Sequence, residues 1–340
     1  MPMSDPAPEE TRVTLVHVAK LAGVSPTTVS HVLSGKRWVA EGTRRTVQEA
    51  IARLGYRPNN VARSLRTRRS KMVAVVLPDI TNSFYGVLAR GLADAVDGAG
   101  YGTYVCNTDG NRDREDAFLA DVVDRGVDGV VMAAGDVTAQ VRVGPAGLGV
   151  PAVCVGGALD DDPHVDRVMP EDGVGSYAAV QHLIHRGSRR IAMIQGPPAS
   201  GTARGEGYRR AMGEAGLAVE PDLVVPGDWT RPGGRKAMHQ LMSGPIRPDA
   251  VFCANDLTAI GAVDALHELN LTVPADVAVV GFDDVDAATI VSPALTTVRN
   301  PAYESGYTAG ELLLSRILGS YTGEGRTVVL PCPLVIRESA

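Results

Sequence analysis

The sequence predicts an α/β body of two doubly wound, parallel-sheet subdomains, preceded by a small all-α domain. The chain has 340 residues, which is more than one compact domain usually contains. From Met72 onward, short apolar runs alternate with amphipathic stretches, as in parallel sheets that helices cover on both faces. The segment before Met72 instead shows helical spacing punctuated by glycine turns.

Charge is distributed unevenly along the chain. Hydrophobic residues make up 44% and charged residues 21%, which excludes disorder over most of the length. Residues 11–71 hold 13 lysines and arginines against two acidic residues, a net charge of +11, whereas residues 72–340 carry a net charge of −14. This asymmetry indicates a small polyanion-binding module joined to an acidic body. Without a motif inside the basic segment, an ordinary solvated basic face would be the better interpretation.

The sequence lacks membrane and secretion signals. No stretch approaches the roughly 20 apolar residues of a membrane span, and the acidic, proline-rich start does not resemble a signal peptide. We therefore expect a cytoplasmic protein with no membrane partner, in which residues 1–12 form a disordered tail. Four scattered cysteines show neither metal-site spacing nor a disulfide framework, so we expect reduced thiols at Cys106, Cys154, Cys253 and Cys332.

The basic segment contains a helix-turn-helix pattern. Leu15–Ala22 has helical spacing, and Gly23 supplies the positive φ that a tight turn needs. Ser25 is a good N-cap and Pro26 suits the first position of a second helix, which runs to about Leu33. A third helix, over about 43–54, closes the small core.

The second helix of such a unit lies in the DNA major groove, with its N-terminal residues toward the base edges. Short hydroxyl side chains there suit phosphate contacts, whereas Thr27 and His31 can reach bases. We therefore expect residues 13–57 to bind double-stranded DNA. The expected contacts are Ser25, Pro26, Thr27, Thr28, Ser30, His31 and Ser34.

Three motifs carry a family resemblance. The run VAKLAGVSPTTVS (residues 18–30), followed by GYRPN (55–59) and ARSL (62–65), closely resembles the lactose/galactose-repressor (LacI/GalR) family, and the resemblance continues through the acidic body. It implies a ligand-responsive transcription regulator, usually a repressor, that binds a palindromic operator as a homodimer or tetramer. It also implies a body like the type I periplasmic sugar-binding proteins and control of carbohydrate uptake or catabolism genes.

The resemblance assigns residues 58–71 as a hinge helix and linker. Pro58 stops the preceding helix, and Asn59 can cap a short helix over 60–65. In the family this segment folds on the operator and a leucine wedges into the minor groove; Leu65 matches that leucine. An ordinary basic linker is the alternative. The expected DNA contacts are Asn59, Ala62, Arg63, Leu65 and Arg66.

Two departures from the family affect base recognition. Family members commonly carry arginine where this chain has His31, and asparagine where it has Ser34. Arginine reads guanine through two hydrogen bonds, whereas a neutral histidine offers one donor and one acceptor. The operator sequence therefore cannot be carried over from the family.

The body over residues 72–340 is expected to divide into an N-subdomain (about 72–169 and 300–329) and a C-subdomain (about 170–299 and 330–340), with crossovers near Met169, Arg299 and Leu330. The expected strands are 72–77, 103–106, 129–133, 152–155, 191–194, 251–253, 277–282 and the crossover strand 296–299. The expected helices are 85–98, 114–124, 176–186, 205–214, 233–242 and 257–269.

Polar and aromatic side chains follow these strands, and ligands of doubly wound sheets bind at the carboxyl ends of strands. The segment 79–85 (DITNSFY) matches a family pattern, Arg204 matches an arginine that clamps effector hydroxyls, and Trp229 matches an aromatic lid. An indole face suits the C–H side of a sugar ring. The expected effector contacts are Asn82, Phe84, Tyr85, Arg204, Trp229, Asn255, Asp283 and Asn300.

Each of these residues also has a structural interpretation. Asp283 can cap a turn, Asn255 can cap a helix, Arg204 can form a surface ion pair, and Trp229 can anchor a loop. Together, at the ends of different strands, they favour a site for a sugar. Residues 171–172 are Glu-Asp where the family commonly has Asp-Asn, so the resemblance does not assign their contacts.

Catalytic patterns are missing from the sequence. It has no Walker P-loop and no GxSxG motif, the pair His182 and His185 reads as an exposed face without a third metal ligand, and the adjacent Asp283 and Asp284 are expected to point apart. We expect no enzyme activity, catalytic residue, metal or cofactor, and a location at the nucleoid. A family member that responds to a purine, a nucleoside or a partner protein remains one alternative. A sugar-binding or sugar-processing protein with a basic appendage is another.

Overall fold

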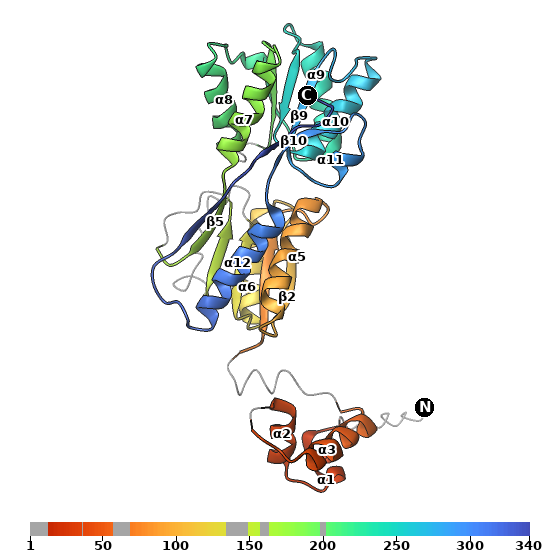
Figure 1. Ribbon diagram of the computed structural model, residues 1–340, viewed down its shortest axis with the longest axis vertical. Helices are drawn as coiled ribbons and strands as arrows, with labels where there is room; N and C mark the ends of the chain where they lie inside the picture. The colour runs from red at the N-terminus through yellow and green to blue at the C-terminus, as the bar shows by residue number, and fades with distance from the viewer. Residues whose placement is uncertain (1–12, 36, 57–68, 134–148, 157–162, 198–201) are drawn as a thin grey trace, which may run out of the picture. The chain divides into compact units, whose positions relative to one another are not determined.

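The computed structural model describes residues 13–35, 37–56, 69–133, 149–156, 163–197 and 202–340 (Figure 1). The chain forms two compact units that divide between Ser70 and Lys71. The first unit is helical, and the second contains two six-stranded sheets with helices between their strands. This confirms the predicted fold class.

The helical unit has the predicted turn between its first two helices. Helix α1 (Leu15–Ala22) ends at Gly23, whose φ is 65°. Helix α2 (Pro26–Ser34) begins after Ser25, whose Oγ accepts a hydrogen bond from the backbone N–H of Thr28 at 3.1 Å. Helix α3 (Glu41–Leu54) begins two residues earlier than expected. The core of the unit contains Val18, Val29 and Val47, all fully buried.

The first sheet of the body has the strand order β11-β5-β4-β3-β1-β2, with all pairs parallel. Its strands are β1 (Met72–Leu77), β2 (Gly102–Asn107), β3 (Gly129–Ala133), β4 (Ala152–Val155), β5 (Asp166–Pro170) and β11 (Thr327–Leu330). Its helices are α5 (Ser83–Asp97), α6 (Arg112–Asp124) and α12 (Ala302–Ile317). Helices α5 and α12 lie side by side (Figure 1), and glycine at Gly91 and Gly306 is required there because a Cβ at either would overlap the backbone of the opposite helix.

The second sheet has the order β12-β10-β9-β8-β6-β7, in which only β12 runs antiparallel to its neighbour. Its strands are β6 (Ile191–Gln195), β7 (Val224–Pro226), β8 (Ala250–Cys253), β9 (Ala278–Asp283), β10 (Thr296–Arg299) and β12 (Leu334–Val335). Its helices are α7 (Asp172–His185), α8 (Thr202–Glu214), α9 (Arg231–Ser243), α10 (Asp256–Glu268), the four-residue α11 (Ala287–Ile290) and the 3₁₀ turn η1 (Pro221–Leu223).

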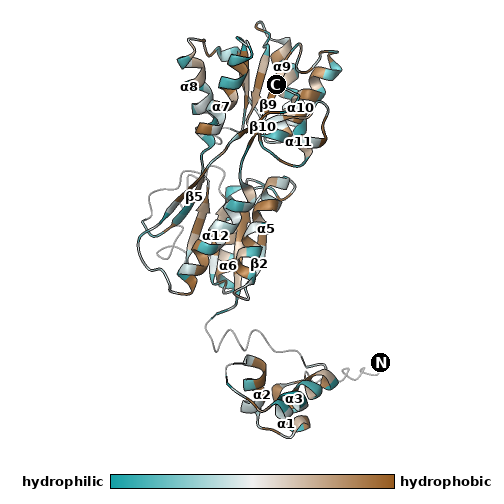
Figure 2. Cartoon of the chain, in the orientation of Figure 1, coloured by the Kyte–Doolittle hydropathy of each residue, from teal (hydrophilic) through white to brown (hydrophobic). Residues whose placement is uncertain are grey.

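The chain passes between the two sheets three times. The passages join β5 to α7, β10 to α12, and β11 to β12. Hydrophobic residues follow the strands of both sheets (Figure 2), and the four cysteines are buried, free thiols, as expected. Within the described part of the chain, no helix is long and apolar enough to cross a membrane.

A buried ion cluster joins the amino ends of β5 and β11, the strands that lead into two of these passages, to α12, and the sequence did not predict it. Asp166, at the start of β5, is fully buried. Its carboxylate accepts two hydrogen bonds from Arg316 on α12, both at 2.8 Å, and others from the backbone and side chain of Arg326, just before β11. Although burial raises the pKa of Asp166, these hydrogen bonds outweigh it and lower the pKa to about 2. The carboxylate of Asp166 therefore links β5, α12 and the residues just before β11.

Candidate functional site

Helix α2 presents a short, hydroxyl-rich N-terminal turn. The side-chain oxygens of Ser25 and Thr28 lie 2.9 Å apart and hydrogen-bond to each other, while Thr27 is exposed. His31 is half-buried, and the exposed Ser34 donates to the His31 backbone carbonyl at 3.4 Å. The hinge residues expected to contact DNA, namely Asn59, Ala62, Arg63, Leu65 and Arg66, lie outside the described residues. The contacts of Ser25, Pro26, Thr27, Thr28, Ser30, His31 and Ser34 with DNA stay predictions.

In the body, Arg204 is the centre of a buried polar cluster. It lies on α8 and is 9% exposed. Its Nε donates to Asp172 Oδ2 at 2.9 Å, one terminal nitrogen lies 3.3 Å from Asp283 Oδ1, and the other donates to the backbone carbonyl of Ala254. The ion pair with Asp283 is therefore buried and that with Asp172 is partly buried, in contrast to the surface pair considered from the sequence. We call Arg204, Asp172, Asp283 and Asn300 the Arg204 cluster.

Three strand ends bring the cluster together. Asp172 is the first residue of α7, immediately after the passage from β5. Asp283 ends β9 and Asn300 follows β10, and these strands are parallel neighbours in which Arg299 pairs with Asp283. Because parallel strands end at the same edge of a sheet, residues far apart in the sequence meet there.

The turn after β9 directs two consecutive carboxylates to different partners. Asp283 and Asp284 have φ values of 111° and 57°, a left-handed backbone that non-glycine residues rarely adopt and that clusters at functional sites. Asp284 forms ion pairs with Arg299 and Arg337, whereas Asp283 faces Arg204. The two carboxylates point apart, as expected from their adjacency.

Asp256 holds this turn in place, a role that the sequence did not reveal. It is fully buried, and its carboxylate accepts from the backbone N–H of Val285 at 2.8 Å and from the hydroxyl of Thr297 at 2.5 Å. Gly281 leaves room for it, because a Cβ at that position would overlap the Asp256 carboxylate. Burial raises the pKa of Asp256 well above its usual value.

The ionisation of the Arg204 cluster follows from burial and from its excess of acidic groups. Burial raises the pKa of Asp283 to about 6; the charge of Asp172 adds to this effect and that of Arg204 opposes it. For Arg204, attraction to Asp172 and Asp283 outweighs burial and raises the pKa of the guanidinium. Arg204 therefore stays protonated, with two carboxylates sharing one cation.

Two buried acceptors in the cluster have no hydrogen-bond donor. Asn300 is 5% exposed, and its Nδ2 lies 3.4 Å from Asp283 Oδ1. Its Oδ1 has no partner, and neither does Oδ1 of Asp172. Because buried polar atoms are nearly always hydrogen-bonded, these two oxygens are ready to accept bonds from hydroxyl or N–H groups of a ligand or from water.

Trp229 lies beside the cluster in a tightly fitted loop. Its φ is 66°, its indole covers Gly196 so closely that a Cβ there would overlap the ring, and the ring centroid is 5.6 Å from the Arg204 guanidinium carbon. Asn255 donates to the Trp229 carbonyl at 3.0 Å and caps α10 by accepting from the Thr258 N–H at 3.0 Å. The structure thus shows the capping role considered for Asn255, together with a role in positioning Trp229. A direct effector contact by Asn255 stays a prediction.

The expected residues of the first sheet lie at the start of α5. Asn82 caps this helix by accepting from the Phe84 N–H at 3.1 Å, and Phe84 packs edge-to-face on Tyr85 with ring centroids 5.2 Å apart. Burial raises the pKa of Tyr85, and the charge of Asp283 adds to this effect while that of Arg204 opposes it. Tyr85 therefore shares the electrostatic surroundings of the Arg204 cluster, although it belongs to the other sheet.

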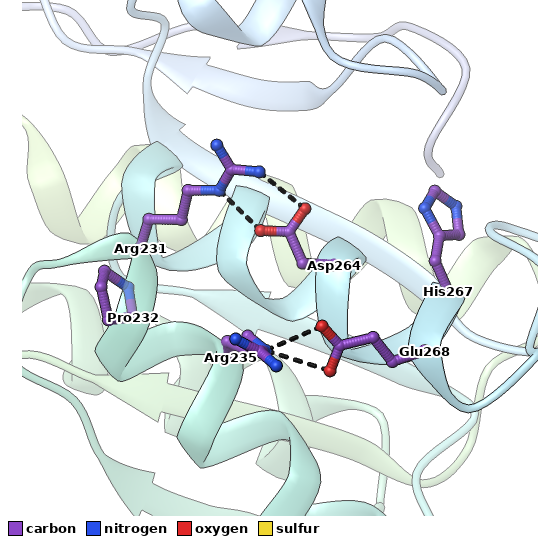
Figure 3. A pocket seen from close by; sticks show the side chains of 6 residues that line it. All are labelled: Arg231, Pro232, Arg235, Asp264, His267 and Glu268. Carbon is purple, nitrogen blue, oxygen red and sulfur yellow. Dashed lines mark hydrogen bonds and ion pairs between the residues drawn. The ribbon is translucent and has the colours of Figure 1, made fainter.

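A second charged region lies between α9 and α10 and contains none of the expected effector residues. It is a groove of about 490 Å³ lined by Arg231, Pro232, Arg235, Asp264, His267 and Glu268 (Figure 3). Its charges neutralise one another, since Arg231 pairs with Asp264 at 2.6 Å and Arg235 with Glu268 at 2.9 Å.

The two histidines considered as metal ligands, His182 and His185, lie in the last turn of α7. His182 is half-buried, with an unpartnered Nε2, which corrects the expectation that it lies on an exposed face. The side chains that the structure describes include no group of three His, Cys, Asp or Glu residues placed to hold a metal ion.

Comparisons with known proteins agree with this architecture. Residues 14–59 match the family model described as bacterial regulatory proteins, lacI family, and residues 180–340 match a periplasmic binding protein-like domain. The ribose operon repressor of Escherichia coli (strain K12) is 38% identical over 330 residues, which cover 96% of this chain and 99% of the relative.

Two solved structures are also similar. The lac repressor dimer bound to operator and the anti-inducer ONPF has a TM-score of 0.86 at 28% identity, over 97% of this chain and 99% of that one. A complex of the transcriptional regulator CelR with cellobiose has a TM-score of 0.73 at 34% identity, over 97% and 100% of the two chains. On the strength of the two matching domains and full-length relatives, this chain belongs to the LacI family of bacterial transcription regulators.

Proposed function

We propose that this chain is a repressor of carbohydrate uptake or catabolism genes and that its effector is a small sugar or sugar derivative bound at the Arg204 cluster. The main support is the pair of unpartnered buried acceptors, Asp172 Oδ1 and Asn300 Oδ1, in a cluster whose central Arg204 lies close to the indole of Trp229. A sugar supplies what such a site lacks, because its hydroxyls donate hydrogen bonds and its ring has an apolar face that an indole covers.

Similar proteins support both the sugar-binding part and the DNA-binding part of this proposal. The ribose operon repressor and the CelR–cellobiose complex are named for sugars, and the lac repressor structure is a dimer on its operator. The protein accordingly binds a palindromic operator as a dimer, with α2 in the major groove. Its place of action is the nucleoid in the cytoplasm. Regulators of this family act by binding DNA and are not enzymes.

A purine or nucleoside is the second candidate effector, because Tyr85 and Trp229 both lie near the charges of the cluster. Two aromatic side chains can hold a planar base between them. A sugar uses the Arg204 cluster more completely, since each of the two unpartnered oxygens needs a donor.

A thermal-shift screen of neutral sugars and purine bases, followed by operator binding with and without the hit, tests the function. Arg204→Ala and Asp283→Ala should abolish the response to the hit and leave operator binding without ligand nearly unchanged. Arg210→Ala is the matched control, because Arg210 is an exposed arginine of the same helix that pairs with Glu214 at 2.9 Å. A full response in the Arg204 and Asp283 variants would show that the effector binds elsewhere.

A further inference from the structure

The charge balance of the Arg204 cluster favours neutral sugars over phosphorylated or acidic sugars. All three nitrogens of Arg204 already have partners: Asp172, Asp283 and the Ala254 carbonyl. Two carboxylates face this one guanidinium, so the cluster carries a net negative charge whenever both are ionised. A phosphate group, with a charge of about −1.5 to −2 near neutral pH, would find Arg204, the cation of these four residues, already paired.

Asp172 gives the cluster its excess of negative charge. Without it, Arg204 would face only Asp283, and one edge of the guanidinium would be open to an anion, which arginine binds well. With it, that edge is occupied, and the second oxygen of the same carboxylate has no donor. The unpartnered oxygen attracts a hydroxyl or amine and repels a phosphate or carboxylate.

We infer that the effector is an unphosphorylated sugar without an acidic group, and that Asp172 excludes sugar phosphates and sugar acids; this inference rests on the proposed function. Hydroxyls of the neutral sugar donate to Asp172 Oδ1 and Asn300 Oδ1. An amino sugar satisfies the same two oxygens and is tolerated.

The test uses the full-length protein and a panel of matched ligands: ribose, glucose and fructose, their phosphates, glucosamine and gluconate, with adenine and hypoxanthine as non-sugars. Thermal shift finds the binders, and calorimetry measures the dissociation constants of a neutral sugar and its phosphate. We expect the phosphate to bind at least about 100-fold more weakly in the wild type, because like charges repel strongly at a buried site.

Asp172→Asn keeps the size of the side chain and removes its charge. The amide oxygen replaces the acceptor toward Arg204, and the amide nitrogen, a donor, replaces the unpartnered oxygen. The ratio between the dissociation constants of phosphate and neutral sugar should fall at least about tenfold. Inorganic phosphate should compete with the neutral sugar in this variant and not in the wild type.

Glu171→Gln is the matched control. It removes the same charge one residue away, where the structure shows no side-chain hydrogen bond, and the ratio should stay as in the wild type. Equal or tighter binding of the phosphate by the wild type overturns the inference and leaves the proposed function standing. An unchanged ratio in Asp172→Asn, or an equal change in Glu171→Gln, overturns the role of Asp172. A panel in which only a purine base binds, or nothing binds, overturns the proposed function together with the inference.

Discussion

The affinity for the sugar effector should depend on pH through Asp283. Burial raises the pKa of this carboxyl to about 6, and a protonated Asp283 is a poorer acceptor for sugar hydroxyls and a poorer partner for Arg204. The perturbation is a change from pH 7 to pH 5, applied to the wild type and to Asp283→Asn. In the variant the group does not titrate.

The size of the effect follows from the ionised fraction of Asp283. With a pKa of about 6, that fraction falls from about 0.9 at pH 7 to about 0.09 at pH 5, so an effector that needs the ionised form binds about tenfold more weakly at pH 5. The groups that face Asp283 are Arg204, Asp172, Asn300 and, through their charges, Asp256 and Tyr85. The raised pKas of Arg204 and Tyr85 keep both of these groups fully protonated across this range.

Calorimetry, or the fluorescence of Trp229, measures the dissociation constant at several values between pH 5 and 7. The variant should bind more weakly at pH 7, with a much flatter profile, because the amide at position 283 does not titrate in this range. Equal pH profiles in the wild type and in Asp283→Asn would refute the assignment of Asp283 as an ionised acceptor for the effector.

Three further perturbations test other parts of the molecule. Asp166→Asn leaves the largely buried Arg316 side chain and the partly buried Arg326 side chain without their counter-charge and should lower the free energy of unfolding of the body by about 3–5 kcal/mol in denaturant titrations. Because the pKa of Asp166 is lowered to about 2, its stabilisation is complete above about pH 4 and is lost as the pH falls toward 2, so the variant should be less acid-sensitive; equal pH dependence would contradict this. Leu65→Ala should lose specific operator affinity and keep salt-sensitive non-specific binding, and a parallel loss of both in binding assays would argue against a minor-groove wedge. His31→Ala should change the selected operator sequence, at a cost of about 1–3 kcal/mol for the preferred base; an unchanged sequence after in vitro selection would exclude His31 as a base reader.

The sequence predicted the elements whose local pattern agrees with their final environment. The continuous apolar strands β1, β3 and β8 and the turn between α1 and α2 were found because burial on both faces, or a left-handed glycine, leaves a local signal. Strands β5, β7, β11 and β12 were missed, since they are short and only partly buried. Helix α12 was missed as well. Its glycines lower helix propensity, and they are explained only by the close approach of α5.

The residues of the candidate site also fall into a group that the sequence predicted and a group that it did not. Arg204, Asp283 and Asn300 stand at recognisable strand ends or in motifs, so the sequence proposed them together. Asp172 was left without an assigned contact, because its pairing with Arg204 spans 32 residues and depends on how α7 and α8 pack. Asp256 was overlooked because its partners, Val285 and Thr297, lie on other elements. Such through-space pairings have no local pattern in the sequence. At position 172 the sequence showed only a departure from the family, without the contact that explains it.

The residues of the candidate site lie at the segments that join the two subdomains. Asp172 follows the first passage between the sheets and Asn300 lies in the second. Cys332 lies in the third, where burial raises the pKa of its thiol to about 12 and Asp172 and Arg204 act on it through their charges. We therefore expect a ligand that hydrogen-bonds Asp172 and Asn300 to act directly on the segments that join the two sheets.

The Asp166 cluster lies at the amino ends of β5 and β11, opposite to the passages that follow these strands. It links the amino ends of β5 and β11 to the last turn of α12, so the two strands that lead into the first and third passages are held within the first sheet. We expect any movement that follows a contact with Asp172 or Asn300 to fall on the few residues between the sheets, as in a hinge. The effector selects between the arrangements only to the extent that it binds one of them more tightly. Asp166→Asn should accordingly weaken the effect of the sugar on operator affinity more than it weakens the binding of the sugar itself. Equal losses in operator-binding and sugar-binding titrations would show that the cluster serves stability alone.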